Sequence, residues 1–153
     1  MYQLKKKIFV DAPITDVWEF FSSPSNLKKI TPTSMGFDIL KGADTSMYPG
    51  QIISYKVKPM LNIPTLWVTE ITHVVDQQYF VDEQRIGPYR MWHHEHHFEQ
   101  VDGGVEITDI VSYVLPFGFF GRIAHWLLVK QKLEHIFAFR SIAIAKYFKV
   151  TDR

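Results

Sequence analysis

The sequence contains no cysteine and carries almost no net charge, and each of these features excludes a class of protein. Without cysteine the chain can form neither a disulfide framework nor a thiolate nucleophile, a composition that we expect for a cytoplasmic protein. The formal net charge is +1, and the longest basic run, residues 5–7, would be divided between the two faces of a strand. Nucleic acids require a basic patch, so we do not expect a nucleic-acid partner.

Several motifs and segment types are also missing. Residues 1–10 have no apolar core of the length that a signal peptide needs. Residues 113–129 form the most hydrophobic stretch, but proline, glycine, arginine and histidine interrupt it, which makes a membrane span unfavourable. The glycines form no phosphate-binding loop, and no serine lies in a nucleophile elbow.

What the chain has in quantity is apolar and aromatic side chains. The sequence is 46% hydrophobic and 15% aromatic over 153 residues. This is enough for one domain, residues 1–153, with a substantial core, and no change in composition marks a second domain. A surplus of large rings can also line a cavity.

The periodicity of apolar residues predicts an α+β fold. Alternation over residues 3–10 predicts a first strand, and Pro13 followed by apolar residues at helical spacing predicts a short helix to Phe21. Residues 26–30 predict a second helical turn. Six β-rich runs separated by turn residues follow, at 37–40, 51–58, 65–75, 78–85, 89–100 and 105–115. Together with the first strand they predict a seven-stranded curved antiparallel sheet with meander connections.

Residues 119–148 contain no proline and only one glycine, which predicts one long C-terminal helix. We expect the sheet to wrap around this helix, because the helix has a continuous apolar side. The residues on that side are Ile123, Trp126, Leu127, Leu133, Phe137, Ile144 and Tyr147.

The strand at 89–100 carries four of the seven histidines and leads through two glycines into the next strand. A turn made of Gly103 and Gly104 predicts an antiparallel hairpin. In this register the opposite pairs are Trp92 with Leu115, His94 with Tyr113, His96 with Val111, and Phe98 with Asp109. His94 and His96 then point toward the core with Asp109 diagonal to His96, whereas His93 and His97 point outward.

His94, His96 and Asp109 form the sharpest candidate site. A carboxylate beside an imidazole fixes its tautomer and raises its basicity, as a general acid or base requires. Two alternatives stay open: a purely structural network that includes Tyr113, and a set of side chains that orients a ligand. On the outer row, His93, Glu95 and His97 lack a further ligand at a convincing spacing, so we expect no metal ion and no cofactor.

Glu70, Glu83 and Arg90 form a second candidate cluster. The neighbouring hairpins would bring Glu83 opposite both Glu70 and Arg90 on the inner row. Two carboxylates around one guanidinium could hold a polar group of a ligand, or could simply complete one end of the sheet.

Two apolar loops could border the mouth of a cavity. Residues 117–121 combine phenylalanines with flexible glycines, and residues 59–64 form an apolar loop bounded by two prolines. The 117–121 segment predicts either a gate, a surface that makes transient contact with a membrane, or core packing at a strand-to-helix corner. A homodimer is a further open alternative.

The order of elements, the opening segment from Val10 through Ala12-Pro13 to Val17-Trp18, and the long terminal helix resemble the SRPBCC superfamily. This superfamily includes START domains, birch-pollen-allergen-like proteins and polyketide cyclase-like proteins, and the resemblance covers essentially the whole chain. The hairpin resembles a bacterial branch of the superfamily through a set of residues: Gly87, Pro88, Tyr89, Trp92, His94, His96, Phe98, Gly103, Gly104, Asp109, Tyr113, Pro116 and Gly118.

The resemblance implies a helix-grip fold with a cavity between sheet and helix that holds a small hydrophobic or amphipathic molecule. It implies no particular reaction, because carriers, receptors and cyclases share the fold. We therefore expect a ligand-binding protein. The alternatives are a polyketide cyclase-like or dehydratase-like enzyme that uses His94, His96 and Asp109, and an interaction module with a collapsed cavity. The residues that we expect to contact the ligand are Trp18, Trp67, Glu70, Glu83, Arg90, Trp92, His94, His96, Tyr113, Trp126 and Phe137.

Overall fold

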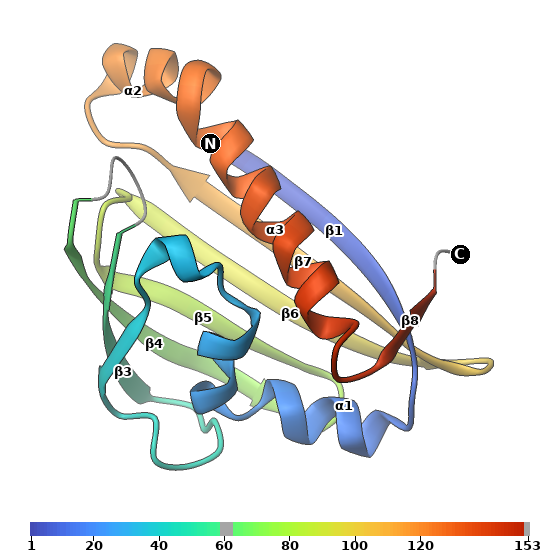
Figure 1. The fold of residues 1–153 in the computed structure, drawn as a ribbon. Helices are drawn as coiled ribbons and strands as arrows, with labels where there is room; N and C mark the ends of the chain where they lie inside the picture. The colour runs from blue at the N-terminus through green and yellow to red at the C-terminus, as the bar shows by residue number, and fades with distance from the viewer. Residues whose placement is uncertain (59–62, 152–153) are drawn as a thin grey trace.

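The computed structural model describes residues 1–58 and 63–151, which form an antiparallel sheet and a helical layer (Figure 1). The loop predicted at 59–64 lies mostly outside the described residues. In chain order the elements are β1 (Tyr2–Asp11), α1 (Ile14–Phe21), the 3₁₀ helices η1 (Pro24–Ile30) and η2 (Thr33–Met35), β2 (Asp38–Lys41), β3 (Gln51–Val57), β4 (Thr65–Val75), β5 (Tyr79–Ile86), β6 (Met91–Val101), β7 (Gly104–Val114), α2 (Gly118–Ala124), the π-helical turn η3 (His125–Val129), α3 (Lys130–Ile144) and β8 (Lys149–Thr151).

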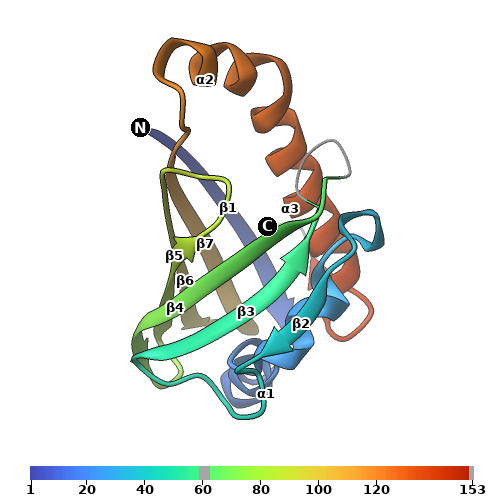
Figure 2. The same cartoon turned by 90° about the vertical axis from the view of Figure 1, so that its left-hand side faces the viewer.

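The described strands form one antiparallel sheet in the order β2-β3-β4-β5-β6-β7-β1-β8. The predicted meander is confirmed from β2 to β7. β1 pairs with β7 on the side away from β6. The sheet curves around α3, and α1 and η1 cover one end of the same face (Figures 1 and 2). Leu133 and Phe137 of α3 pack on Trp92, Val111 and Tyr113, which lie on the inner row of β6 and β7.

The prediction of seven strands was wrong by one, because the chain ends its last helix at Ile144 and adds the strand β8. β8 pairs with β1 through Val150 opposite Val10. Val150 packs against the core next to α1, and the Lys149 ammonium contacts the Asp11 carboxylate at 2.8 Å. A strand of three residues with one inward apolar side chain, Val150, shows too little alternation in the sequence to be distinguished from the end of a helix.

The predicted register of the histidine hairpin was also wrong, although the predicted faces are confirmed. The turn consists of Asp102 and Gly103, so the strands are displaced by two residues from the expected pairing. The observed opposite pairs are Trp92 with Tyr113, His94 with Val111, His96 with Asp109, and Phe98 with Ile107. Side chains alternate with a period of two, so this displacement leaves His94 and His96 on the inner row.

The two glycines of this hairpin have different roles. Gly103 is in a left-handed conformation (φ 79°) that glycine adopts without steric cost. Gly104 belongs to β7, where a Cβ atom would collide with the backbone carbonyl of Val10 on the neighbouring strand. Close approach of β1, rather than turn chemistry, therefore accounts for the second glycine.

The C-terminal helix differs from the single α-helix predicted over residues 119–148. The inward positions are Gly121, His125, Val129 and Leu133, a spacing of four residues that the wider π-helical turn at His125–Val129 permits. Trp126, expected on the buried side, is 77% exposed. Ile123, Leu127 and Tyr147 are exposed as well, so the expected packing is confirmed only for Leu133, Phe137 and Ile144.

Trp18 anchors the core under α1. Its indole packs edge-on against the rings of Phe80 and Phe98, with centroids 6.1 and 5.3 Å away. None of the helices within residues 1–58 and 63–151 combines the length and the apolar composition needed to cross a bilayer.

Candidate functional site

A cavity of about 170 Å³ lies between the sheet, the helices η1 and η2, and α3. An engineered apolar cavity of ~150 Å³ admits benzene, so this volume is enough for at least one aromatic ring. Most of the wall is apolar, with contributions from Phe21, Phe37, Trp67, Trp92, Leu133 and Phe137. The cavity exists because these large side chains border the space between sheet and helix without filling it.

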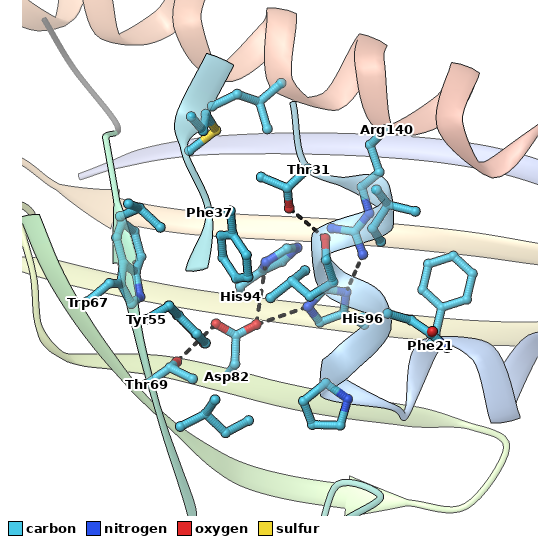
Figure 3. Close-up of a pocket in the computed structure, with 18 of the residues that line it drawn as sticks. Phe21, Thr31, Phe37, Tyr55, Trp67, Thr69, Asp82, His94, His96 and Arg140 are labelled. Carbon is cyan, nitrogen blue, oxygen red and sulfur yellow. Dashed lines mark hydrogen bonds and ion pairs between the residues drawn. The ribbon is translucent and has the colours of Figure 1, made fainter. Parts of the chain in front are cut away.

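Charged side chains occupy one part of the cavity wall (Figure 3). Asp82 comes from β5, His94 and His96 from β6, and Arg140 from α3, and all four line the cavity. Asp109 of β7 is opposite His96 and contacts both histidines, so it is the fifth member of this group. We call these five residues the charged cluster.

The charged cluster is buried, with His94, His96, Asp109 and Arg140 each no more than 8% exposed. Burying charge without compensation costs several kcal/mol per ion, so each charge needs a partner nearby. The strands supply these partners because β5, β6 and β7 are adjacent and present their inward side chains in one row.

Two adjacent imidazoles, tilted by 37° relative to each other, bridge the two carboxylates. The rings of His94 and His96 have centroids 3.7 Å apart. His96 contacts Asp82 through Nε2 at 3.0 Å and Asp109 through Nδ1 at 2.8 Å. His94 contacts Asp109 through Nε2 at 3.1 Å and Asp82 through Nδ1 at the longer distance of 3.5 Å.

These distances favour one arrangement of the protons. Both nitrogens of His96 lie within hydrogen-bond distance of a carboxylate oxygen, which is the arrangement that suits an imidazolium donating from both nitrogens. His94 donates from Nε2 to Asp109, and its Nδ1 is left as an acceptor beside the cavity. Asp82 also accepts a hydrogen bond from the Thr69 hydroxyl at 3.3 Å.

The pKa directions agree with this assignment. Burial, the largest single effect, lowers the pKa of both imidazoles. For His96, hydrogen bonds to Asp109 and Asp82 outweigh burial and raise its pKa, whereas for His94 burial and the charge of His96 prevail and its pKa falls. Burial alone would raise the pKa of both aspartates, but Arg140 and the imidazoles hold the pKa of Asp109 well below its usual range and lower that of Asp82. Two carboxylates, one imidazolium and one guanidinium therefore balance in charge.

The guanidinium of Arg140 lies beside Asp109 and His96 but is incompletely hydrogen-bonded by the described residues. Its Nη1 lies 3.7 Å from Asp109, and its Nη2 lies 3.5 Å from Nδ1 of His96. The guanidinium is 5.7 Å from the ring of Phe21 and 5.8 Å from the ring of Phe137. Its Nε is buried and has no hydrogen-bond partner among the residues that the structure describes. Unsatisfied buried donors are uncommon in folded proteins.

Asp82, His94 and His96 also offer three metal-ligand atoms within 4.8 Å of one another. Asp82 supplies the carboxylate of this group from the neighbouring strand β5. The same atoms, however, already contact one another within the charged cluster, where Asp82 lies 3.0 Å from Nε2 of His96 and 3.5 Å from Nδ1 of His94, and the Arg140 guanidinium lies beside them. In this arrangement the positive charges of His96 and Arg140 balance the carboxylates of Asp82 and Asp109.

His93, Glu95 and His97 lie on the outer face, where His93 contacts Glu83 at 2.8 Å and His97 contacts Glu95 at 2.9 Å.

The structure brings some of the expected ligand-contacting residues to the cavity and leaves others elsewhere. Trp67, Trp92, His94, His96 and Phe137 line the cavity. The remaining aromatic candidates do not: Trp18 is part of the core under α1, Tyr113 is buried and hydrogen-bonds His125 at 2.9 Å, and Trp126 is exposed.

Glu70 and Glu83 are directly opposite each other, as expected, but the guanidinium between them belongs to Arg85 rather than Arg90. The Arg85 guanidinium contacts Glu70 at 2.6 Å and Glu83 at 3.2 Å. A β-bulge between Ile71 and His73 explains why Glu70 faces outward, and Glu83 faces outward because it lies opposite the outward-facing His93. The bulge reverses the alternation of β4, so that Thr69 rather than Glu70 points into the cavity.

The sequence analysis missed Asp82 and Arg140, although weak signals exist for both. Asp82 follows the buried Phe80 by two residues on β5, so the two side chains point to the same face of the sheet. Arg140 lies on the apolar side of the last helix, between Phe137 and Ile144 at helical spacing. A charged residue in such a position needs buried partners, which marks it as a site candidate.

No protein-family model matches the sequence, and a comparison with curated proteins also finds no match. Solved structures do match. TTHA0849 from Thermus thermophilus has a TM-score of 0.69 at 13% identity over 95% of this chain and 99% of that one. Protein Ms6760 from Mycobacterium smegmatis has a TM-score of 0.65 at 17% identity, with 95% and 92% covered.

Plant proteins of the SRPBCC superfamily match in the same way. Ara h 8.0201 has a TM-score of 0.60 at 14% identity over 94% of this chain and 98% of that one. The major latex-like protein 151 from Panax ginseng has a TM-score of 0.59 at 13% identity, with 88% and 95% covered. At these identities the likeness concerns the fold, and it agrees with the strand order and the terminal helix described above. The chain therefore has a helix-grip fold like that of these solved structures.

Proposed function

We propose that this protein binds a small amphipathic molecule in the cavity between the sheet and α3. The apolar body of the ligand lies against Trp67, Trp92 and Phe137, and an oxygen acceptor of the ligand, a carboxylate or a carbonyl, accepts a hydrogen bond from Nε of Arg140. His96 reinforces the same end of the cavity as a second cationic group.

The single observation that carries this proposal is the buried Nε of Arg140, which has no hydrogen-bond partner within residues 1–58 and 63–151, in the wall of a largely apolar cavity. Leaving such a donor unsatisfied costs on the order of 1–3 kcal/mol, which a ligand acceptor would recover. An apolar pocket with a few convergent polar groups is also the usual form of a small-molecule site. The open cavity gives no support to the alternative of an interaction module with a collapsed one.

A matched pair of probes tests the proposal. Naphthalene-2-carboxylate carries the acceptor, and 2-methylnaphthalene has nearly the same shape without it. Calorimetric titration of the protein should give tighter binding of the carboxylate, and thermal unfolding should show a ligand-dependent rise in Tm. Absence of binding for both probes would contradict the proposal, and equal affinities would remove the role of Arg140.

Variants of Arg140 sharpen the test. Arg140→Lys keeps the positive charge near Asp109 but loses the Nε donor, so it should fold and lose most of the preference for the carboxylate, roughly 10-fold or more. Arg140→Met removes the charge as well and should abolish that preference. A fully retained preference in Arg140→Lys would show that the donor is not used.

A second candidate function is acid–base catalysis on a ligand in the same cavity, as in a cyclase or dehydratase. The observation that favours it is the pair of adjacent imidazoles in the cavity wall, one an acceptor at Nδ1 and one protonated. In the dehydration of a β-hydroxy ketone, His94 would take the α-proton, and His96 would protonate the departing hydroxyl to give water and an enone.

Spectrophotometry with 4-hydroxy-4-phenylbutan-2-one as the probe tests this candidate, because the product is a conjugated enone. Turnover above the rate without protein, lost in His96→Gln, would support catalysis. No turnover would leave binding as the function of the cavity.

A further inference from the structure

We propose that the segment from Phe117 to Leu128 is a docking surface for anionic membranes. This segment includes α2 and most of η3, and it projects beyond the end of the sheet in both views of the fold (Figures 1 and 2). The proposal does not depend on the identity of the cavity ligand. We call the exposed apolar side chains of this segment the α2–η3 surface.

The α2–η3 surface is unusually apolar for a face in contact with water. Phe117, Phe120 and Trp126 are 81%, 73% and 77% exposed. The whole surface consists of Phe117, Phe119, Phe120, Ile123, Trp126, Leu127 and Leu128, each at least 42% exposed. Scattered exposed apolar residues are ordinary, but a contiguous group in one segment marks an interaction surface.

Specific contacts on the opposite side hold this orientation. His125 stacks on Tyr2 with ring centroids 3.5 Å apart and lies 2.9 Å from the Tyr113 hydroxyl. Gly121 approaches the Pro116 carbonyl so closely that a Cβ atom would collide with it. The inward positions are thus fixed by packing, and the apolar residues between them must point away from the sheet.

The corner that begins the surface is also strained. Phe117 has a φ of 67°, in the left-handed region that a bulky side chain rarely adopts. The residue is nevertheless the most exposed member of the surface. An unfavourable backbone conformation that presents a phenylalanine to solvent is more easily explained by interaction than by packing.

The charges around the surface select the partner. Residues 110–133 include Arg122, Lys130 and Lys132 and contain no aspartate or glutamate. Basic residues beside exposed aromatic and aliphatic side chains are the composition that lies in the interface of an anionic bilayer. A second copy fits less well, because a symmetric contact would bring the same basic segment of both copies together.

Vesicle co-sedimentation at low ionic strength tests the proposal. The wild-type protein should bind vesicles of phosphatidylcholine with phosphatidylglycerol, and bind pure phosphatidylcholine at least several-fold less. Phe120→Ser with Trp126→Ser should lose binding to both, because these exposed residues supply apolar area without supporting the fold. Arg122→Gln with Lys130→Gln should keep weak binding but lose the preference for anionic lipid and its salt dependence.

Ile142→Ser is the matched control. Ile142 is 66% exposed on α3, outside the α2–η3 surface, so this variant removes a comparable apolar residue from the same helical layer and should bind like the wild type. Circular dichroism of all variants establishes that they are folded.

Three results would overturn the proposal. The wild type could fail to bind either vesicle, or Ile142→Ser could lose as much binding as the Phe120/Trp126 variant. Light scattering could instead reveal a dimer that only the Phe120/Trp126 substitutions dissociate, which would assign the surface to self-association.

Discussion

Neighbouring residues of strand β6 carry the same side chain in two different environments. His94 and His96 point inward, are almost fully buried, and bridge two carboxylates at the cavity wall. His93 and His97 point outward, are partly exposed, and contact the carboxylates of Glu83 and Glu95 on the surface. Strand alternation alone produces this difference, and it separates the histidines that line the cavity from the histidines on the outer face of the sheet.

The largest expected effect comes from removing a buried carboxylate. Asp109→Asn leaves Arg140 and the protonated His96 with one negative charge fewer, and should lower the free energy of unfolding by about 3–5 kcal/mol. Glu95→Gln, on the outer row of the same hairpin, should change it by less than ~0.5 kcal/mol. Urea unfolding measures both, and equal effects would remove the distinction between the two rows.

Substitution of single histidines should give the next largest difference. His96→Gln removes hydrogen bonds to two buried carboxylates and should cost about 1–3 kcal/mol. His97→Gln breaks one surface pair and should cost at most ~0.5 kcal/mol. Chemical denaturation is again the measurement, and a cost for His97→Gln as large as that for His96→Gln would contradict the account.

The pH dependence of stability follows from the same row. The folded state raises the pKa of His96, so its contribution is fully present below the ordinary value of 6.5 and is lost as the pH rises through the raised pKa. The pKa values of Asp82 and Asp109 are lowered, so their contributions are present above 3.8 and are lost as the pH falls through the lowered values. The lowered pKa of His94 adds a further loss of stability below 6.5.

Thermal unfolding as a function of pH checks this prediction. Tm should decline on both sides of a maximum, and His96→Gln should flatten the alkaline side in particular. An alkaline decline that persists unchanged in His96→Gln would assign it to another group.

The smallest expected effect lies on the outer face. Glu83→Gln weakens its contacts with Arg85 and His93, which are partly exposed, and should change the free energy of unfolding by less than ~0.5 kcal/mol. High salt should reduce even this difference, because exposed ion pairs are screened. A loss of more than ~2 kcal/mol in the free energy of unfolding, measured in urea, would mean that the contacts of Glu83 on the outer face support the fold as strongly as the charged cluster does.

Sequence patterns predicted the inward face of the hairpin because alternation survives a slip of two residues. The sequence therefore located His94 and His96 correctly, although the opposite residue of His96 is Asp109 rather than Val111. The helix-grip architecture was predictable for a similar reason, since the order of strands and helices does not depend on exact register.

Local irregularities hid the rest of the site. The bulge in β4 exchanged Glu70 for Thr69 on the inner row, and the π-helical turn rotated Trp126 away from the sheet. Each is a local change in backbone hydrogen bonding, which side-chain patterns do not encode. Arg140 was missed because it lies among apolar residues on α3, where its partners come from strands far away in the chain.

Calorimetric titration of naphthalene-2-carboxylate into the wild type, His96→Gln and His97→Gln tests most directly whether the inner row forms a ligand site. The account predicts binding by the wild type, an affinity at least roughly 10-fold weaker in His96→Gln, and a change within ~2-fold in His97→Gln. Equal affinities in all three proteins, or no binding by the wild type, would contradict it.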